Sequence, residues 1–160
     1  MRILGIDPGI GRTGWAIVDF DKNTPKAIAY GCIETTINGE MPARLLAIKQ
    51  ELERIIASHN PQALGIEDLF FANNAKTAFA VGQARGVVLL LAAEHNLSVG
   101  IYTPLQVKSA ITGYGKAEKA QVGKMVKVLL HLEAVPKPDD TADALAIALT
   151  YAFSSKMKQK

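Results

Sequence analysis

Short apolar runs separated by polar turns open this chain, and longer stretches with apolar residues at every third or fourth position dominate the remainder. The first pattern is typical of strands and the second of amphipathic helices. The strand pattern predicts five strands, over residues 2–7, 13–20, 26–36, 63–67 and 98–102. The helix pattern predicts five helices, from Pro42 to about His59 and over about 75–95, 104–111, 117–131 and 140–153.

The order of these elements predicts the fold class. The first three strands follow one another directly, as in a meander, whereas each later strand is followed by a helix. Alternation of helix and strand is typical of α/β proteins with helices on both sheet faces. We therefore expect one α/β domain over residues 1–160, with a mixed five-stranded sheet flanked by helices on both faces.

Composition narrows the class of protein. Hydrophobic residues make up 49% of the chain, which is typical of a globular protein and not of a disordered one. We find no charge-free apolar run of about 18 residues and no secretory signal pattern, so we expect a cytoplasmic protein without a membrane span. Cys32 is the single cysteine, which excludes an internal disulfide and fits a reducing compartment.

Charge is distributed unevenly along the chain. Residues 1–103 carry 9 Lys and Arg against 10 Asp and Glu, whereas residues 104–160 carry 9 Lys against 5 acidic residues. A lysine-rich last third indicates an anionic partner such as nucleic acid. A solvated helix face followed by a basic tail explains the same charge, so both interpretations stay open at this point.

Two carboxylates each stand at the end of an apolar strand. Asp7 ends the first strand, before the turn residues Pro8 and Gly9, and Glu67 ends the fourth. Asp7 alone would be interpreted as a turn cap. If the two strands pair in parallel, however, both carboxylates emerge at the sheet edge where α/β proteins bind ligands. Asp68 follows directly, and strand alternation points its side chain to the other face.

Two further carboxylates open the last predicted helix. Asp140 and Asp143 are three residues apart, so they share one helical face. Asp139 or Asp140 could act only as a helix cap. Asp143 is less easily explained in that way, because it opens an otherwise apolar helix, where an unpaired carboxylate is costly.

Four carboxylates in one place would repel one another unless cations were bound. Mg²⁺ prefers carboxylate oxygens and also binds phosphate oxygens. Two such ions can stabilise both the attacking and the leaving oxygen of a phosphodiester displacement. The chain has no Cys/His cluster typical of zinc, no phosphate-binding loop with a lysine and no Gly-x-Ser-x-Gly motif. The pattern thus favours metal-dependent phosphodiester chemistry.

Several motifs, in order along nearly the whole chain, resemble the RuvC family of Holliday-junction resolvases. They are Leu4 to Gly9; Ile66-Glu67 followed by Phe70 and Asn74; Gly82 to Gly86; Gln106 to Lys108; Ala117 to Val122; and Asp140 to Ala146. The resemblance implies a ribonuclease-H-like fold, a homodimer, dependence on Mg²⁺ or Mn²⁺, and cooperation with a branch-migration complex of the RuvA and RuvB type. It also implies paired nicks in opposite strands of a four-way DNA junction.

The same resemblance assigns roles to residues. It makes Asp7, Glu67, Asp140 and Asp143 the catalytic ligands of one or two metal ions per subunit, and it places Lys119 near the active centre. Phe70 would stack on an unpaired base, although it could instead be a core residue. The remaining expected DNA contacts are Asn74, Lys76, Lys108 and Lys116, together with Lys119 itself.

The predicted function is therefore a metal-dependent, structure-selective endonuclease that acts in recombination and repair. Other functions fit parts of the pattern. A nuclease of the same fold acts on structured RNA precursors, and a junction-binding module would not cleave. An actin-like ATPase or sugar kinase shares the Gly-x-Asp-x-Gly hairpin, but it needs a second such domain. One face of the apolar helix over about 75–95 is expected to pack on the sheet, and the other could form the dimer contact, although core packing alone is a serious alternative.

Overall fold

The structure, a computed structural model, describes residues 1–68 and 75–157. Its strands are β1 (Arg2–Asp7), β2 (Arg12–Asp21), β3 (Thr24–Glu34), β4 (Ala63–Glu67) and β5 (Ser98–Tyr102). Its helices are α1 (Met41–His59), α2 (Ala75–Glu94), α3 (Pro104–Thr112), α4 (Lys119–Leu129) and α5 (Asp139–Met157). Every predicted element is present. The largest difference is at the end of α5, which continues four residues beyond the predicted Phe153, whereas β3 begins and ends two residues earlier than predicted and includes Pro25.

The strands form one mixed sheet in the order β3-β2-β1-β4-β5. β1 pairs antiparallel with β2 and parallel with β4, and β4 pairs parallel with β5. Antiparallel neighbours are joined by short turns, whereas the parallel connections each require a crossover that includes a helix. Pro25 is tolerated within β3 because β3 is an edge strand.

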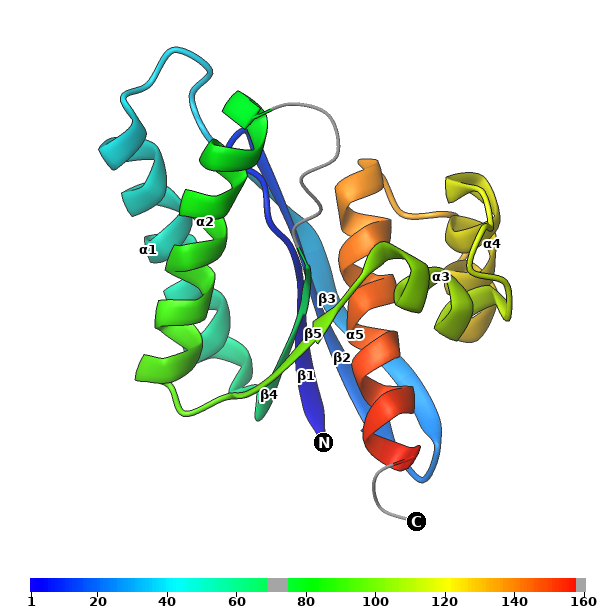
Figure 1. The fold of residues 1–160 in the computed structure, drawn as a ribbon. Helices are drawn as coiled ribbons and strands as arrows, with labels where there is room; N and C mark the ends of the chain where they lie inside the picture. The colour runs from blue at the N-terminus through cyan, green and yellow to red at the C-terminus, as the bar shows by residue number, and fades with distance from the viewer. Residues whose placement is uncertain (69–74, 158–160) are drawn as a thin grey trace.

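Helices cover both faces of the sheet, as Figure 1 shows. α1 and α2 pack on one face, where Leu4, Ile6 and Ile17 belong to the buried cluster. α5 packs on the other face, with α3 and α4 beside it. This three-layer arrangement confirms the predicted class, and it leaves the carboxyl ends of β1 and β4 beside the first turns of α5.

Two glycines let α5 approach the sheet closely. A Cβ atom on Gly14 of β2 would lie 2.0 Å from the carbonyl oxygen of Asp140, and one on Gly5 of β1 would lie 2.2 Å from that of Ala144. Only glycine fits at such distances, so these two positions fix where α5 begins relative to β1 and β2.

Part of α2, Thr77–Glu94, is long and apolar enough to cross a membrane by length and composition, with a mean hydropathy of 1.3. Such a helix is weak evidence for a span, since apolar helices of soluble proteins pass the same test. The window contains Arg85 and Glu94, which agrees with the prediction that no charge-free run of this length exists. Only 22% of it is buried within the protein.

Candidate metal-dependent active site

Asp7 and Glu67 end neighbouring parallel strands. The register pairs Ile6 of β1 with Ile66 of β4, so the two carboxylates occupy the next position along each strand. The parallel pairing on which the sequence argument depended is therefore confirmed. Both backbones stop at the same sheet edge, because parallel strands end together there.

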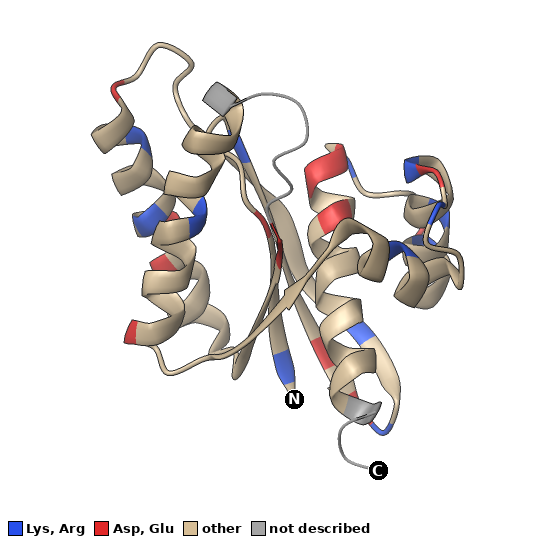
Figure 2. Ribbon diagram, viewed as in Figure 1, with Lys and Arg blue, Asp and Glu red and all other residues tan. Residues whose placement is uncertain are grey.

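Asp140 and Asp143 come to that edge from α5. Asp7 pairs with Gly14 across the β1–β2 ladder, and the Asp140 backbone lies directly on Gly14. Asp143 follows within one helical turn. Figure 2 shows the result, with acidic residues at the ends of the central strands facing those in the first turns of α5. Two strands and one helix, distant in sequence, thus supply the four predicted carboxylates to one region.

The electrostatics confirm that these groups share one environment. The pKa of Asp7 is raised from its ordinary 3.8 to about 7, first by burial and then by the charges of Asp143, Glu67 and Asp140. Burial also raises the pKa of Glu67, as does the charge of Asp143. Asp7 therefore experiences the repulsion of all three other carboxylates, which is the penalty that a bound cation relieves.

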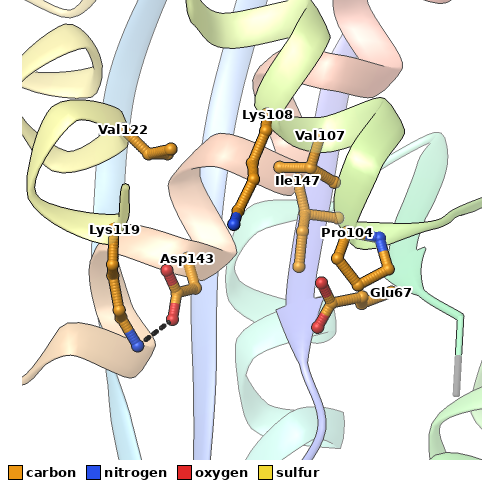
Figure 3. Close-up of a pocket in the computed structure, with 8 residues that line it drawn as sticks. All are labelled: Glu67, Pro104, Val107, Lys108, Lys119, Val122, Asp143 and Ile147. Carbon is orange, nitrogen blue, oxygen red and sulfur yellow. Dashed lines mark ion pairs between the residues drawn. The ribbon is translucent and has the colours of Figure 1, made fainter. Parts of the chain in front are cut away.

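A pocket of about 200 Å³ opens beside these carboxylates (Figure 3). Glu67 and Asp143 stand on its two sides, and Lys108 of α3 extends toward the space between them. Its other wall is apolar, formed by Pro104, Val107, Val122 and Ile147. A pocket with both acidic and basic side chains on an apolar wall suits a phosphate group held beside a cation.

Lys119 binds one of the carboxylates directly. Its Nζ lies 2.6 Å from Oδ2 of Asp143, as the dashed line in Figure 3 marks. Burial raises the pKa of Asp143, whereas the hydrogen bond and charge of Lys119 lower it. Partial burial lowers the pKa of Lys119, but its hydrogen bond to Asp143 and the nearby carboxylates raise it above the ordinary range. Lys119 is thus charged at neutral pH.

The donor set fits a hard divalent cation. Among residues 1–68 and 75–157, no three His, Cys, Asp or Glu side chains already converge closely enough to hold a metal ion. The chemistry of the site nevertheless matches Mg²⁺, because the four acidic side chains offer only oxygen donors and three of them have raised pKa values. Asp7, Glu67, Asp140 and Asp143 are the residues that could hold the ion.

The predicted lysines differ in whether they line this pocket. Lys108 and Lys119 line the pocket, whereas Lys116 lies on the connection between α3 and α4 and does not. Lys76 lies on α2, and nothing is described of its side chain. Phe70 and Asn74 lie outside the described residues. Their predicted roles in DNA binding therefore stay predictions.

Arg85 of α2 is a site residue to which the sequence assigned no role. Its side chain is 17% exposed, its Nε donates a hydrogen bond of 3.4 Å to the carbonyl oxygen of Glu67, and its guanidinium lies 3.6 Å from Asp68. Arg85 thereby ties α2 to the end of β4. The motif Gly82 to Gly86 contains this residue, but no spacing rule connects it with Glu67.

Comparison with known proteins identifies relatives over almost the full chain. The family model described as crossover junction endodeoxyribonuclease RuvC matches residues 3–151. The crossover junction endodeoxyribonuclease RuvC of Alkaliphilus oremlandii is 50% identical, with 99% of this chain and 97% of that protein covered. The protein of the same name from Caldicellulosiruptor saccharolyticus is 51% identical, with 97% and 94% covered.

Solved structures give the same result. The Thermus thermophilus RuvC structure superposes with a TM-score of 0.92 at 35% identity, covering 99% of this chain and 97% of that one. T. thermophilus RuvC in complex with a Holliday junction substrate superposes with a TM-score of 0.90 at 33% identity, covering 98% and 96%. The similarity extends through every strand and helix described above.

Proposed function

This chain belongs to the RuvC family of crossover junction endodeoxyribonucleases, and from that premise we propose that it makes paired, symmetric nicks in opposite strands of a Holliday junction. It is a Holliday-junction resolvase of recombination and repair, with a ribonuclease-H-like fold. The observation that carries the residue-level proposal is the repulsion that Asp7 experiences from Glu67, Asp140 and Asp143 at one sheet edge. We assign all of residues 1–160 to one nuclease domain that works in the bacterial cytoplasm.

The four carboxylates are proposed to be the catalytic metal ligands. Asp7 and Glu67 approach from the sheet, Asp140 and Asp143 from α5, and together they bind one or two Mg²⁺ or Mn²⁺ ions per subunit. When bound, such an ion neutralises the carboxylates and stabilises negative charge on the phosphate oxygens during phosphodiester hydrolysis. The raised pKa values of Asp7, Glu67 and Asp143 support this role, because burial and the neighbouring carboxylates disfavour their charged forms more than Lys119 and Lys108 favour them.

Lys119 and Lys108 hold the scissile strand in this proposal. Lys119, ion-paired with Asp143, carries a positive charge beside the carboxylates and stabilises charge on the reacting phosphate. Lys108 lowers the pKa of Glu67 by its charge and borders the same pocket, so it contacts a neighbouring phosphate. Lys116, Lys76 and Asn74 bind the backbone farther out, and Phe70 stacks on a base at the crossover.

Dimerisation supplies the second nick. Phe79, Gly86 and Leu90 lie on one face of α2, since seven and four residues are about two turns and one turn of helix. Phe79 is 70% exposed and Leu90 is 54% exposed, and a Cβ on Gly86 would meet nothing within 4 Å. We propose that this face packs on the same face of a second copy, which places two active sites on one junction. A branch-migration complex of the RuvA and RuvB type is the further partner.

Cleavage of a labelled four-way junction tests the function directly. The junction and a plain duplex of the same sequence are incubated with Mg²⁺, and the cuts are mapped on each strand. We expect symmetric cuts in opposite strands of the junction and none in the duplex. Binding without cuts would favour a non-cleaving module. Preferential cutting of a structured RNA precursor would favour the RNA-processing alternative.

A further inference from the structure

The turn that follows Asp7 accepts hydrogen bonds from residues outside the β1–β2 hairpin to which it belongs. In this β1–β2 turn, residues 8–11, the carbonyl groups of Gly9, Ile10 and Gly11 each accept a hydrogen bond. The Thr13 hydroxyl donates to the carbonyl oxygen of Gly9 at 2.7 Å, and the Thr35 backbone N–H donates to that of Gly11 at 3.1 Å. Only the first of these partners lies within the hairpin.

Arg44 completes this set of contacts at the middle carbonyl. Its Nη2 donates to the carbonyl oxygen of Ile10 at 3.2 Å, and its Nε donates to Thr35 Oγ1 at 2.8 Å. The Thr35 hydroxyl in turn donates to the Ile10 carbonyl at 2.5 Å. One guanidinium on the first turn of α1 therefore joins α1, the segment after β3 and the β1–β2 turn.

The chemistry of these contacts explains why an arginine serves here. No ion pair to a carboxylate is found for Arg44 within residues 1–68 and 75–157, so its charge is not used in a salt bridge. What it offers is a planar fork that reaches two acceptors at once. A lysine ammonium lacks such a planar pair of donors, so it could not make both contacts with the same geometry.

The turn has little freedom to absorb a displacement. A Cβ on Gly9 would lie 2.2 Å from the carbonyl oxygen of Arg12, so the chain closes tightly on itself. Pro8 is buried, and it joins Asp7 directly to this turn. A displacement of the Ile10 carbonyl would therefore also displace Asp7, which experiences the charges of the other three carboxylates.

We propose that Arg44 is a positioning residue for cleavage, which holds the β1–β2 turn through Thr35 and Ile10 and thereby fixes the Asp7 carboxylate in the active site. This inference rests on the proposed metal-ligand role of Asp7. It adds to that role a residue on α1, on the face of the sheet opposite α5.

Kinetics on the full chain with a four-way junction test the inference. Arg44→Ala is expected to lower kcat by about 10- to 100-fold at saturating Mg²⁺, the order of loss that follows a misplacement of about 1 Å, and to leave junction affinity without metal unchanged. Methylguanidinium in solution is expected to restore part of that kcat. Thr35→Val, which removes the hydroxyl but keeps the shape, is expected to lower kcat without further loss in the double variant.

Arg54→Ala is the matched control, because Arg54 is on the same helix, is 72% exposed and forms an ion pair with Glu51 of its own helix. It is expected to cleave as the unmodified protein does. Amide hydrogen exchange gives a readout besides activity, since residues 8–13 are expected to exchange faster in Arg44→Ala while the amides of β4 do not. Arg44→Lys, which keeps the charge but not the fork, is expected to resemble Arg44→Ala.

Three results would overturn the positioning role. The first is an unchanged kcat in Arg44→Ala. The second is weakened junction binding in Arg44→Ala with full activity in Arg44→Lys, which would make Arg44 a phosphate contact. The third is a loss that methylguanidinium does not restore and that appears with faster exchange throughout the sheet. An inactive Asp7→Asn beside a normal Arg44→Ala would refute this inference alone, whereas an active Asp7→Asn would refute the proposed site.

Discussion

The Lys119 ammonium lies 2.6 Å from a carboxylate oxygen of Asp143, which joins the first residue of α4 to the second turn of α5. The Lys119 side chain is 58% exposed and that of Asp143 is 28% exposed, so the pair is in contact with solvent. Solvent screening makes such a pair a weak contributor to stability. We propose that its role is in catalysis, because it places a positive charge beside the proposed metal ligands.

Lys119→Met should lower cleavage by about 100-fold or more at neutral pH, because one fixed charge beside the reacting phosphate is lost. The hydrogen bond and charge of Lys119 lower the pKa of Asp143, so that pKa should rise in the variant. The acidic limb of the kcat profile should consequently move to higher pH. Rates measured across pH on a four-way junction check both effects. Lys124→Met, exposed on the same helix, is the control, and an equal loss there would contradict the assignment.

Asp7→Asn should bind junctions normally and cleave them about 1,000-fold more slowly or worse, a loss of at least ~4 kcal/mol in transition-state stabilisation. The amide keeps the size of the side chain but removes its charge. Junction affinity by fluorescence anisotropy and single-turnover cleavage with Mg²⁺ measure the two properties separately. Asp21→Asn, at an exposed position at the end of β2, is the matched control. Normal cleavage by Asp7→Asn would remove Asp7 from the catalytic set.

The metal-free protein should become less stable as pH rises from about 4 to 7. Asp7 titrates near 7 in the folded state against an ordinary 3.8, so the folded state holds a proton that the unfolded chain has already released. The free energy of unfolding therefore falls through this window, by at most about 4 kcal/mol before solvent screening reduces it. Urea unfolding in EDTA should give a higher midpoint at about pH 5.5 than at about pH 8.

Asp7→Asn provides the control for that pH dependence. Its urea midpoint should vary less between the two pH values, and it should be more stable than the unmodified protein at the higher one, since a repelled buried charge is gone. Added Mg²⁺ should stabilise the unmodified protein at the higher pH and have less effect on the variant. A midpoint that rises with pH in EDTA would show that the charge on Asp7 is already compensated.

Phe79→Asp should convert the protein to a monomer. Two charges would face each other across the proposed α2 contact, where Phe79 is 70% exposed in the single chain. Light scattering at high concentration measures the mass, and junction cleavage should change from paired to single nicks. Val128→Asp is the control, because Val128 is an apolar residue of α4 with 62% exposure. A Phe79→Asp dimer, or an unmodified protein that is already monomeric, would place the contact elsewhere or exclude it.

Phe70→Ala should weaken cleavage more than junction binding, because stacking on a crossover base positions the strand for reaction. Loss of one such contact is about 1–3 kcal/mol by analogy with single-strand binding. Phe70→Trp, which keeps an aromatic face, should retain cleavage. Measurement of kcat and of junction affinity in both variants tests the stacking role. Unchanged cleavage in Phe70→Ala would dismiss the stacking role.

The sequence by itself determined the elements and the identity of the acidic residues. The local sequence pattern was sufficient to predict every strand and helix, because periodicity and turn residues act over a few positions. The ends were less certain: Pro25 falls inside β3, which only its place at the sheet edge permits. The motifs around Asp7, Glu67 and Asp143 were sufficient to suggest the family, and the comparisons then confirmed it.

Tertiary structure alone decided which side chains act together. Gly14 and Gly5 look like ordinary strand glycines in the sequence, yet their lack of a Cβ is what brings Asp140 beside Asp7. Arg85 donates to the backbone carbonyl of Glu67, and Arg44 donates to that of Ile10, in the turn after Asp7. No local pattern encodes such a contact between segments. The physical reason is that periodicity reports how one segment faces the core, whereas a site depends on distances between segments that only packing sets.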